Sequence, residues 1–174
     1  MKDKTTLWIV LVMLAIVGGI GWLYAVQGEK MQEKLSKTLI GEKMPDQGAV
    51  HVARGAEHVE YNSNPPTSGP HWAGVAGPGI KTEPVADELV LHSMEHGAAV
   101  VWYRADLSAE EVEKIKTAFN KSSGKKIMLS RENLDTPLAL TSWGYLLKLE
   151  AVDEEQIVAF IETNNDRAPE KAPI

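Results

Sequence analysis

The pattern of apolar and polar positions divides the chain into an apolar N-terminal segment and a mixed remainder. Residues 7–26 (LWIVLVMLAIVGGIGWLYAV) contain no charged residue and would be apolar on every side of a helix. About 20 such residues span the hydrocarbon core of a bilayer at roughly 1.5 Å per residue. Trp8 lies near one end, and Trp22 and Tyr24 near the other, where interfacial aromatic residues are typical. The pattern therefore predicts a single-pass transmembrane helix.

A cleaved signal peptide is the alternative interpretation of this segment. Signal peptides usually have an apolar core of about 7–15 residues followed by a small-x-small cleavage site. The run here is longer, and residues 24–27 (YAVQ) form a poor cleavage site. We therefore favour a retained anchor.

The segment after the anchor changes to a charged pattern. Met31, Leu35 and Leu39 recur at helical spacing, which predicts a helical stalk, and residues 41–48 (GEKMPDQG) have the composition of a linker. The expected divisions of the chain are an N-terminal tail (1–6), an anchor (7–26), a stalk and linker (27–46), a soluble domain (47–169) and a C-terminal tail (170–174). We expect the Pro-rich end from Arg167 to be frayed.

Strand patterns occur in the second half of the domain. Residues 98–103 (AAVVWY) form a continuous apolar run typical of a buried strand, and residues 126–130 (KIMLS) predict a second strand. Residues 137–150 predict one long strand or a bent pair, with Gly144 as a candidate bulge.

Two helices alternate with these strands. Ser108 and Glu111 have the spacing of a capping box, and Asp153 is a second candidate N-cap. Strands and helices are mixed without a strict βαβ repeat. The pattern therefore predicts a small α+β domain with a mixed or antiparallel sheet and two to three helices.

Charge and cysteine content restrict the function. The net charge of −6 argues against a nucleic-acid partner, because phosphate binding requires a clustered basic face. The chain has no cysteine, which excludes a disulfide framework, a thiolate metal site and a cysteine nucleophile. Any metal ion must therefore be held by imidazole, carboxylate or thioether groups.

The stretch 49–84 is rich in glycine, proline, asparagine and serine, and its most distinctive piece is YNSNPPTSGPH (61–71). Adjacent prolines fix φ and remove backbone donors, so this piece is neither a helix interior nor a central strand. A long ordered loop of this kind is uncommon unless it is functional. We expect it to be a rigid scaffold for His71, built from Pro65, Pro66, Thr67, Ser68, Gly69 and Pro70.

All five histidines lie between positions 51 and 96. On a strand, His92 and His96 would be about 13 Å apart, whereas on a helical turn they share a face. We therefore expect a helical turn that ends at Gly97 and presents both imidazoles to one metal ion. His71 is the candidate third ligand and His51 the candidate fourth, since neutral imidazole binds Zn, Cu, Fe and Ni. The fifth histidine, His58, is expected to be exposed and outside the site.

Three other interpretations remain open. In the first, the histidines hold loops together in a metal-free interaction module. His92–His96 also fits the H-x-x-E-H pattern of a zinc-dependent hydrolase with Glu95 as general base, although Gly97 would truncate the required helix. Met94 suggests a copper-binding thioether, but on a helix it points away from the shared face and packing in the core is favoured.

The combination of PPTSGPH (65–71), LHSMEHG (91–97), VVWY (100–103) and LTSWGYLL (140–147) resembles a bacterial and archaeal family of uncharacterised domains. The resemblance implies an N-terminal membrane anchor and a location outside the cytoplasm. It favours metal binding by the recurring histidines but implies no activity. Members of the family typically have leucine where this chain has Met94, which weakens the case for a thioether ligand.

These observations lead to one hypothesis. A membrane-anchored extracytoplasmic domain binds one transition-metal ion, copper slightly ahead of zinc, through His71, His92 and His96, with His51 as the candidate fourth ligand. Glu95 would accept an imidazole N–H and fix the tautomer. The function would be metal handling or redox chemistry in the cell envelope. The sequence names neither a substrate nor a protein partner.

Overall fold

The computed structural model describes residues 3–174. The chain divides into two units, with the boundary between Thr38 and Leu39. The N-terminal unit is one helix, α1 (Lys4–Ser36), in which no residue is buried. Asp3 caps the helix by accepting a hydrogen bond from the backbone N–H of Thr5 at 3.2 Å. The predicted apolar segment and most of the predicted stalk thus form one continuous helix. It is long and apolar enough to cross a membrane.

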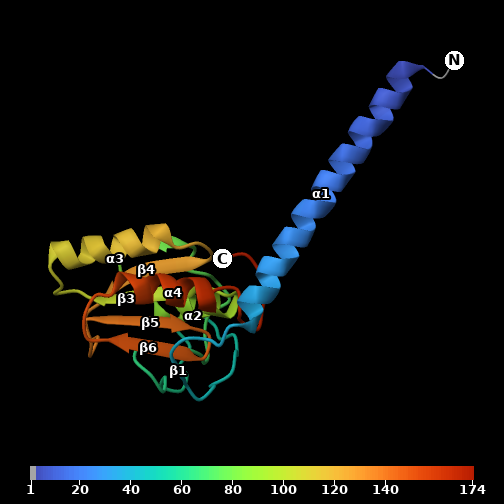
Figure 1. Cartoon of the computed structure of the whole chain (residues 1–174). Helices are drawn as coiled ribbons and strands as arrows, with labels where there is room; N and C mark the ends of the chain where they lie inside the picture. Colours follow the sequence, from blue (N-terminus) through green and yellow to red (C-terminus); the bar gives the residue numbers. More distant parts are fainter. Residues whose placement is uncertain (1–2) are drawn as a thin grey trace. The chain divides into compact units, whose positions relative to one another are not determined.

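The second unit contains a six-stranded mixed sheet with the order β1-β6-β5-β3-β4-β2 (Figure 1). β3 pairs in parallel with β4, and β4 with β2, whereas β3–β5, β5–β6 and β6–β1 are antiparallel. The strands are β1 (Glu42–Lys43), β2 (Gly79–Ile80), β3 (Ala99–Arg104), β4 (Lys126–Arg131), β5 (Leu138–Ser142) and β6 (Tyr145–Leu149). The α+β class is confirmed.

Of the two forms predicted for residues 137–150, one long strand or a bent pair, the structure shows the pair. β5 and β6 form a hairpin in which Ser142 pairs with Tyr145. Gly144 lies in the two-residue connection with φ of +71°, so the prediction of a bulge at Gly144 is wrong. A tight hairpin loop needs a residue with positive φ, and glycine adopts it at no steric cost.

Three helices accompany the sheet: α2 (Asp87–Glu95), α3 (Ala109–Lys121) and α4 (Glu154–Asn164). The predicted capping box is present at α3. Ser108 Oγ accepts from the Glu111 N–H at 3.3 Å, and Glu111 Oε2 accepts from the Ser108 N–H at 3.0 Å. Asp153 caps α4 as predicted, accepting from the Gln156 N–H at 3.0 Å. The two helices predicted from capping patterns are therefore confirmed.

The sheet is covered on both faces because its central strands alternate their side chains. Val101 of β3 packs with apolar residues of α3 and α4, whereas Val100 and Trp102 pack with those of α2. The helices α3 and α4 therefore cover one face. The other face carries α2, the helix that contains His92 and Glu95.

The second unit begins before the expected boundary at Gln47. The backbone N–H of Ile40 donates to Asn164 Oδ1 at 3.0 Å, and Asn164 Nδ2 donates back to the Ile40 carbonyl at 2.9 Å. The expected linker also contributes β1, which pairs with β6. These hydrogen bonds make residues 40–43 part of the folded unit.

The C-terminal segment is hydrogen-bonded, so the prediction that it frays is wrong. The N–H of Glu170 donates to the carbonyl of Glu95 at 3.1 Å. His96 Nδ1 contacts the Pro173 carbonyl at 2.8 Å, and Lys125 Nζ donates to the Ala172 carbonyl at 2.9 Å. The segment is held by these hydrogen bonds, two of which join it to residues at the C-terminal end of α2.

Gly97 allows the chain to leave α2, as predicted, with φ of +95°. A Cβ added there would lie 2.9 Å from Asp166 Cα. We expect Gly97→Ala to lower the free energy of unfolding by about 1–3 kcal/mol, because it combines backbone strain with a backbone clash. Urea denaturation of the full chain in detergent measures this loss.

Gly55→Ala is the matched control, since Gly55 has φ of +80° but no atom near the added Cβ. We expect a smaller loss there, of about 1 kcal/mol, from backbone strain alone. Equal losses in the two variants would contradict the assignment of a steric clash at Gly97.

Candidate metal centre

Four side chains from three separate segments converge on one point of the second unit. His51, His71, His92 and Glu95 each offer one ligand atom, and these atoms all lie within 4.8 Å of one another. The ring centroids of His51, His71 and His92 are 4.7–5.2 Å apart. The structure therefore brings together three of the four predicted histidine ligands and adds the carboxylate of Glu95.

The proline-rich loop holds His71 in a fixed place. The Tyr61 hydroxyl donates to the Pro70 carbonyl at 2.8 Å, and Ser68 Oγ accepts from the Gln47 N–H at 2.9 Å. Burial raises the pKa of Tyr61 well above its usual value, with Glu88 and Asp87 adding to the effect, so this donor stays protonated. Gly69 has φ of +126°, and a Cβ there would lie 3.0 Å from the Tyr61 ring. These contacts support the predicted role of the loop as a scaffold.

A short parallel bridge brings His51 to His71. The His71 N–H donates to the Val50 carbonyl at 3.0 Å, and the Val52 N–H donates to the His71 carbonyl at 2.8 Å. Backbone pairing thus places two histidines that are 20 positions apart side by side. Sequence spacing alone gives no sign of this contact.

His92 and Glu95 come from the last turn of α2, where residues three apart share a side of the helix. Their closest ligand atoms, His92 Nε2 and Glu95 Oε2, are 4.0 Å apart. Both residues are buried, with 6% and 4% of their surface exposed. The helix therefore presents one imidazole and one carboxylate from its buried side.

Backbone carbonyls set the tautomers of the two buried histidines. His71 Nδ1 lies 2.8 Å from the Gly69 carbonyl, and His92 Nδ1 lies 3.1 Å from the Gly74 carbonyl. A carbonyl only accepts, so each Nδ1 carries the hydrogen, and each neutral ring has its lone pair on Nε2. The carbonyls of Gly69 and Gly74 thus perform the orienting role that the sequence assigns to Glu95.

This arrangement places two acceptors face to face. His71 Nε2 lies 3.0 Å from Glu95 Oε2, in a place where the His71 side chain is fully buried. A lone pair and a carboxylate oxygen at this distance repel each other unless a cation, either a proton or a metal ion, lies with them. The site is therefore complementary to a positive charge.

The spacing of the donors suits a small metal ion. A tetrahedral ion with bonds of about 2.0–2.1 Å keeps its ligand atoms about 3.3 Å apart. Glu95 Oε2 lies 3.0 Å from His71 Nε2, 3.4 Å from His51 Nε2 and 4.0 Å from His92 Nε2. These distances bracket the tetrahedral value, so the group can accept an ion after small movements of its side chains.

Burial lowers the pKa of His92, and the neighbouring His96, His71 and His51 lower it further. The hydrogen bond to the Gly74 carbonyl acts in the opposite direction without reversing the shift. His92 is therefore neutral at pH 7, the state in which its Nε2 can bind a metal ion.

The remaining predicted residues lie outside the four-residue group. His96 caps α2 with its ring 4.4 Å from that of His92, and its Nε2 faces Glu170 Oε2 at 3.2 Å. His58 is half-buried and lies 3.4 Å from Glu88 Oε1, so the prediction that it is exposed is wrong. Met94 is fully buried in the core, as favoured from the sequence.

Arg131 links the two segments that carry the buried ligands, and sequence reasoning missed it. Its guanidinium binds both carboxylate oxygens of Asp87, at 2.7 and 3.0 Å, at the start of α2. Its Nε donates to Asn64 Oδ1 at 2.6 Å, next to the proline-rich loop. A charged residue at the end of a strand carries no signal of this role, because both partners are distant in sequence.

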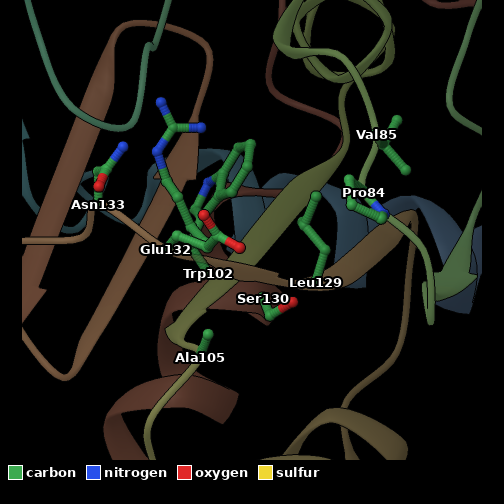
Figure 2. Close-up of a pocket in the computed structure, with 9 residues that line it drawn as sticks. Pro84, Val85, Trp102, Ala105, Leu129, Ser130, Glu132 and Asn133 are labelled. Carbon is green, nitrogen blue, oxygen red and sulfur yellow. The ribbon is translucent and has the colours of Figure 1, made fainter.

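A separate cavity of about 430 Å³ lies near the ends of β3 and β4 (Figure 2). Pro84 and Val85 lie on one side of it, with Glu132 and Asn133 on the other (Figure 2). Trp102 also lines it, but this indole is buried and donates to Thr141 Oγ1 at 2.7 Å. The cavity contains no histidine among its lining residues and none of the four converging ligands.

Comparison with known proteins finds one family. A family model described as "Protein of unknown function (DUF3105)" matches residues 51–173, which include all four converging residues. No curated protein and no solved structure matches the chain.

The lowered pKa of His92 predicts a pH dependence of stability in the metal-free chain. Between the folded-state pKa and the unfolded value of about 6.5, the unfolded state binds more protons, so the free energy of unfolding falls as the pH falls. The slope from one such group is at most about 1.4 kcal/mol per pH unit. We expect wild type to lose stability more steeply than His92→Gln below pH ~6.5, in urea titrations with chelator present. Parallel pH profiles would contradict this.

Proposed function

The chain belongs to the DUF3105 family of proteins of unknown function, and we propose that its domain binds one transition-metal ion through His51, His71, His92 and Glu95. The observation that carries the proposal is the opposition of His71 Nε2 and Glu95 Oε2 at 3.0 Å in a buried place. Both buried imidazoles hold their Nδ1–H on a carbonyl, which leaves their Nε2 lone pairs for the ion. Nδ1–H groups held in this way are typical of histidine ligands.

The donor set narrows the choice of metal. Three imidazole nitrogens and one carboxylate oxygen suit divalent zinc or copper, whereas Cu(I) prefers sulfur. The argument for copper from Met94 loses its support, since the thioether packs in the core. We propose zinc or divalent copper, held for metal handling at a membrane.

Hydrolysis is the less favoured chemistry for this site. A general base needs a carboxylate that is free to take a proton from a bound water. Glu95 Oε2 instead lies within 3.0–4.0 Å of all three imidazoles, in the position of a ligand. The geometry therefore supports Glu95 as a metal ligand rather than as the general base of a zinc-dependent hydrolase.

The stoichiometry of metal binding tests the proposal. The full chain, purified in detergent without a histidine tag and stripped with chelator, would be titrated with Zn²⁺ and with Cu²⁺ and examined by elemental analysis. We expect about one ion per chain in wild type. His71→Ala and Glu95→Gln should lose stoichiometric binding, because the first removes a buried imidazole ligand and the second removes the buried carboxylate ligand.

His58→Ala is the matched control, since His58 also faces a carboxylate but lies outside the group. It should bind as wild type does, and circular dichroism should show that all variants remain folded. Unchanged binding in His71→Ala would contradict the proposed ligand set. No bound ion in wild type would instead favour the metal-free interaction module.

We also propose that α1 anchors the chain in a membrane with the second unit outside the cytoplasm. The length, apolar composition and exposure of α1 support the anchor. Lysines flank both ends of the apolar segment, so the distribution of charge does not set the orientation. The family resemblance supports the proposed orientation.

The absence of cysteine gives a direct test of this orientation. Glu57→Cys and Lys4→Cys each introduce one thiol at an exposed position. On intact cells, a membrane-impermeant maleimide should label Glu57→Cys, while Lys4→Cys should react only after permeabilisation. The reverse labelling pattern would overturn the orientation, and release of the chain by an alkaline wash would overturn the anchor.

A further inference from the structure

We propose that His51 is the exchangeable ligand of the metal site, through which an ion passes between the domain and a metal-accepting partner. The inference rests on the metal site proposed above and adds a direction of exchange to it. Its basis is an asymmetry in burial. The His51 side chain is 45% exposed, whereas those of His71, His92 and Glu95 are 0%, 8% and 5% exposed.

The hydrogen bonds of the histidine rings show the same asymmetry. His71 and His92 each have Nδ1 bonded to a carbonyl, which fixes the ring plane as well as the tautomer. Among residues 3–174, the His51 ring has one polar contact, from Nε2 to Glu95 Oε2 at 3.4 Å. Its ring contacts are with the rings of His71 and His92, at centroid distances of 4.9 and 4.7 Å. His51 can therefore rotate away without breaking a buried hydrogen bond.

The segment that carries His51 is also more exposed than those of the other ligands, although the bridge to His71 holds its backbone. Its neighbour Val50 is 62% exposed. The buried ligands, in contrast, come from a helix packed on the sheet and from a loop whose residues 65–69 are all buried. The three buried ligands, His71, His92 and Glu95, are thus held in place, and His51 lies between them and the solvent.

This construction supports exchange of the ion by stepwise replacement of ligands. The bond from the ion to His51 Nε2 breaks as a donor of the partner forms a new bond, and the ion keeps its charge throughout. His71, His92 and Glu95 hold the ion until further donors of the partner replace them. A purely structural ion, in contrast, is enclosed by ligands on all sides and keeps no open route.

Release kinetics of Zn²⁺ from the full chain in detergent test this inference. The acceptor is the colorimetric chelator 4-(2-pyridylazo)resorcinol, at several concentrations. We expect the wild-type release rate to rise with chelator concentration, because the chelator enters at the His51 position. His51→Ala should still hold one Zn²⁺ but release it at least about tenfold faster. Added imidazole should slow that release, and His58→Ala should behave as wild type.

The outcomes separate this inference from the proposed function. If wild type holds no ion, both are overturned. If wild type holds one ion but releases it at a rate that is independent of chelator concentration and unchanged in His51→Ala, the exchange role alone is overturned. Complete loss of binding in His51→Ala, as in His71→Ala, would equally overturn it, because His51 would then be an essential structural ligand.

Discussion

The arrangement of the second unit's candidate site depends on one electrostatic constraint, the meeting of imidazole nitrogens with a carboxylate in a buried place. His71 Nε2 and Glu95 Oε2 lie 3.0 Å apart, with the His71 side chain fully buried. A neutral ring with its hydrogen on Nδ1 and a carboxylate would both only accept here, so the contact requires a cation, either a proton or a metal ion. Metal binding would supply that charge, and folding and binding would then be thermodynamically coupled.

The irregular half of the domain can be understood as the support for this contact. The proline-rich loop fixes His71, a parallel bridge places His51 beside it, and α2 presents His92 and Glu95 from its last turn. Arg131 at the end of β4 joins the start of α2 to the residue before the prolines. The sheet thus acts as a rigid base, and preorganised ligands of this kind lose little entropy when they bind an ion.

The family match falls within one of the two units of the chain. The matched range, 51–173, contains the whole ligand group and excludes α1. Residues 39–50 precede the match but belong to the folded unit, since β1 extends the sheet. The candidate ligand group therefore lies in the part that the family model matches, and the helix that is long and apolar enough to cross a membrane lies outside it.

The sequence by itself determined the elements and the histidine-rich region, because these follow from local patterns. The apolar run of α1, the strands β3 and β4, the Ser108 capping box and the end of α2 at Gly97 all depend on a few neighbouring residues. The tertiary structure decided which residues form the site. On a helix, residues three and four apart share a side, so Glu95 and His96 were equally able to join His92. The contacts of His96 with Pro173 and Glu170 direct its ring away from the four-residue group, and the pairing of His51 with His71 brings His51 into it. These contacts join residues 20 to 77 positions apart, and no local pattern encodes them.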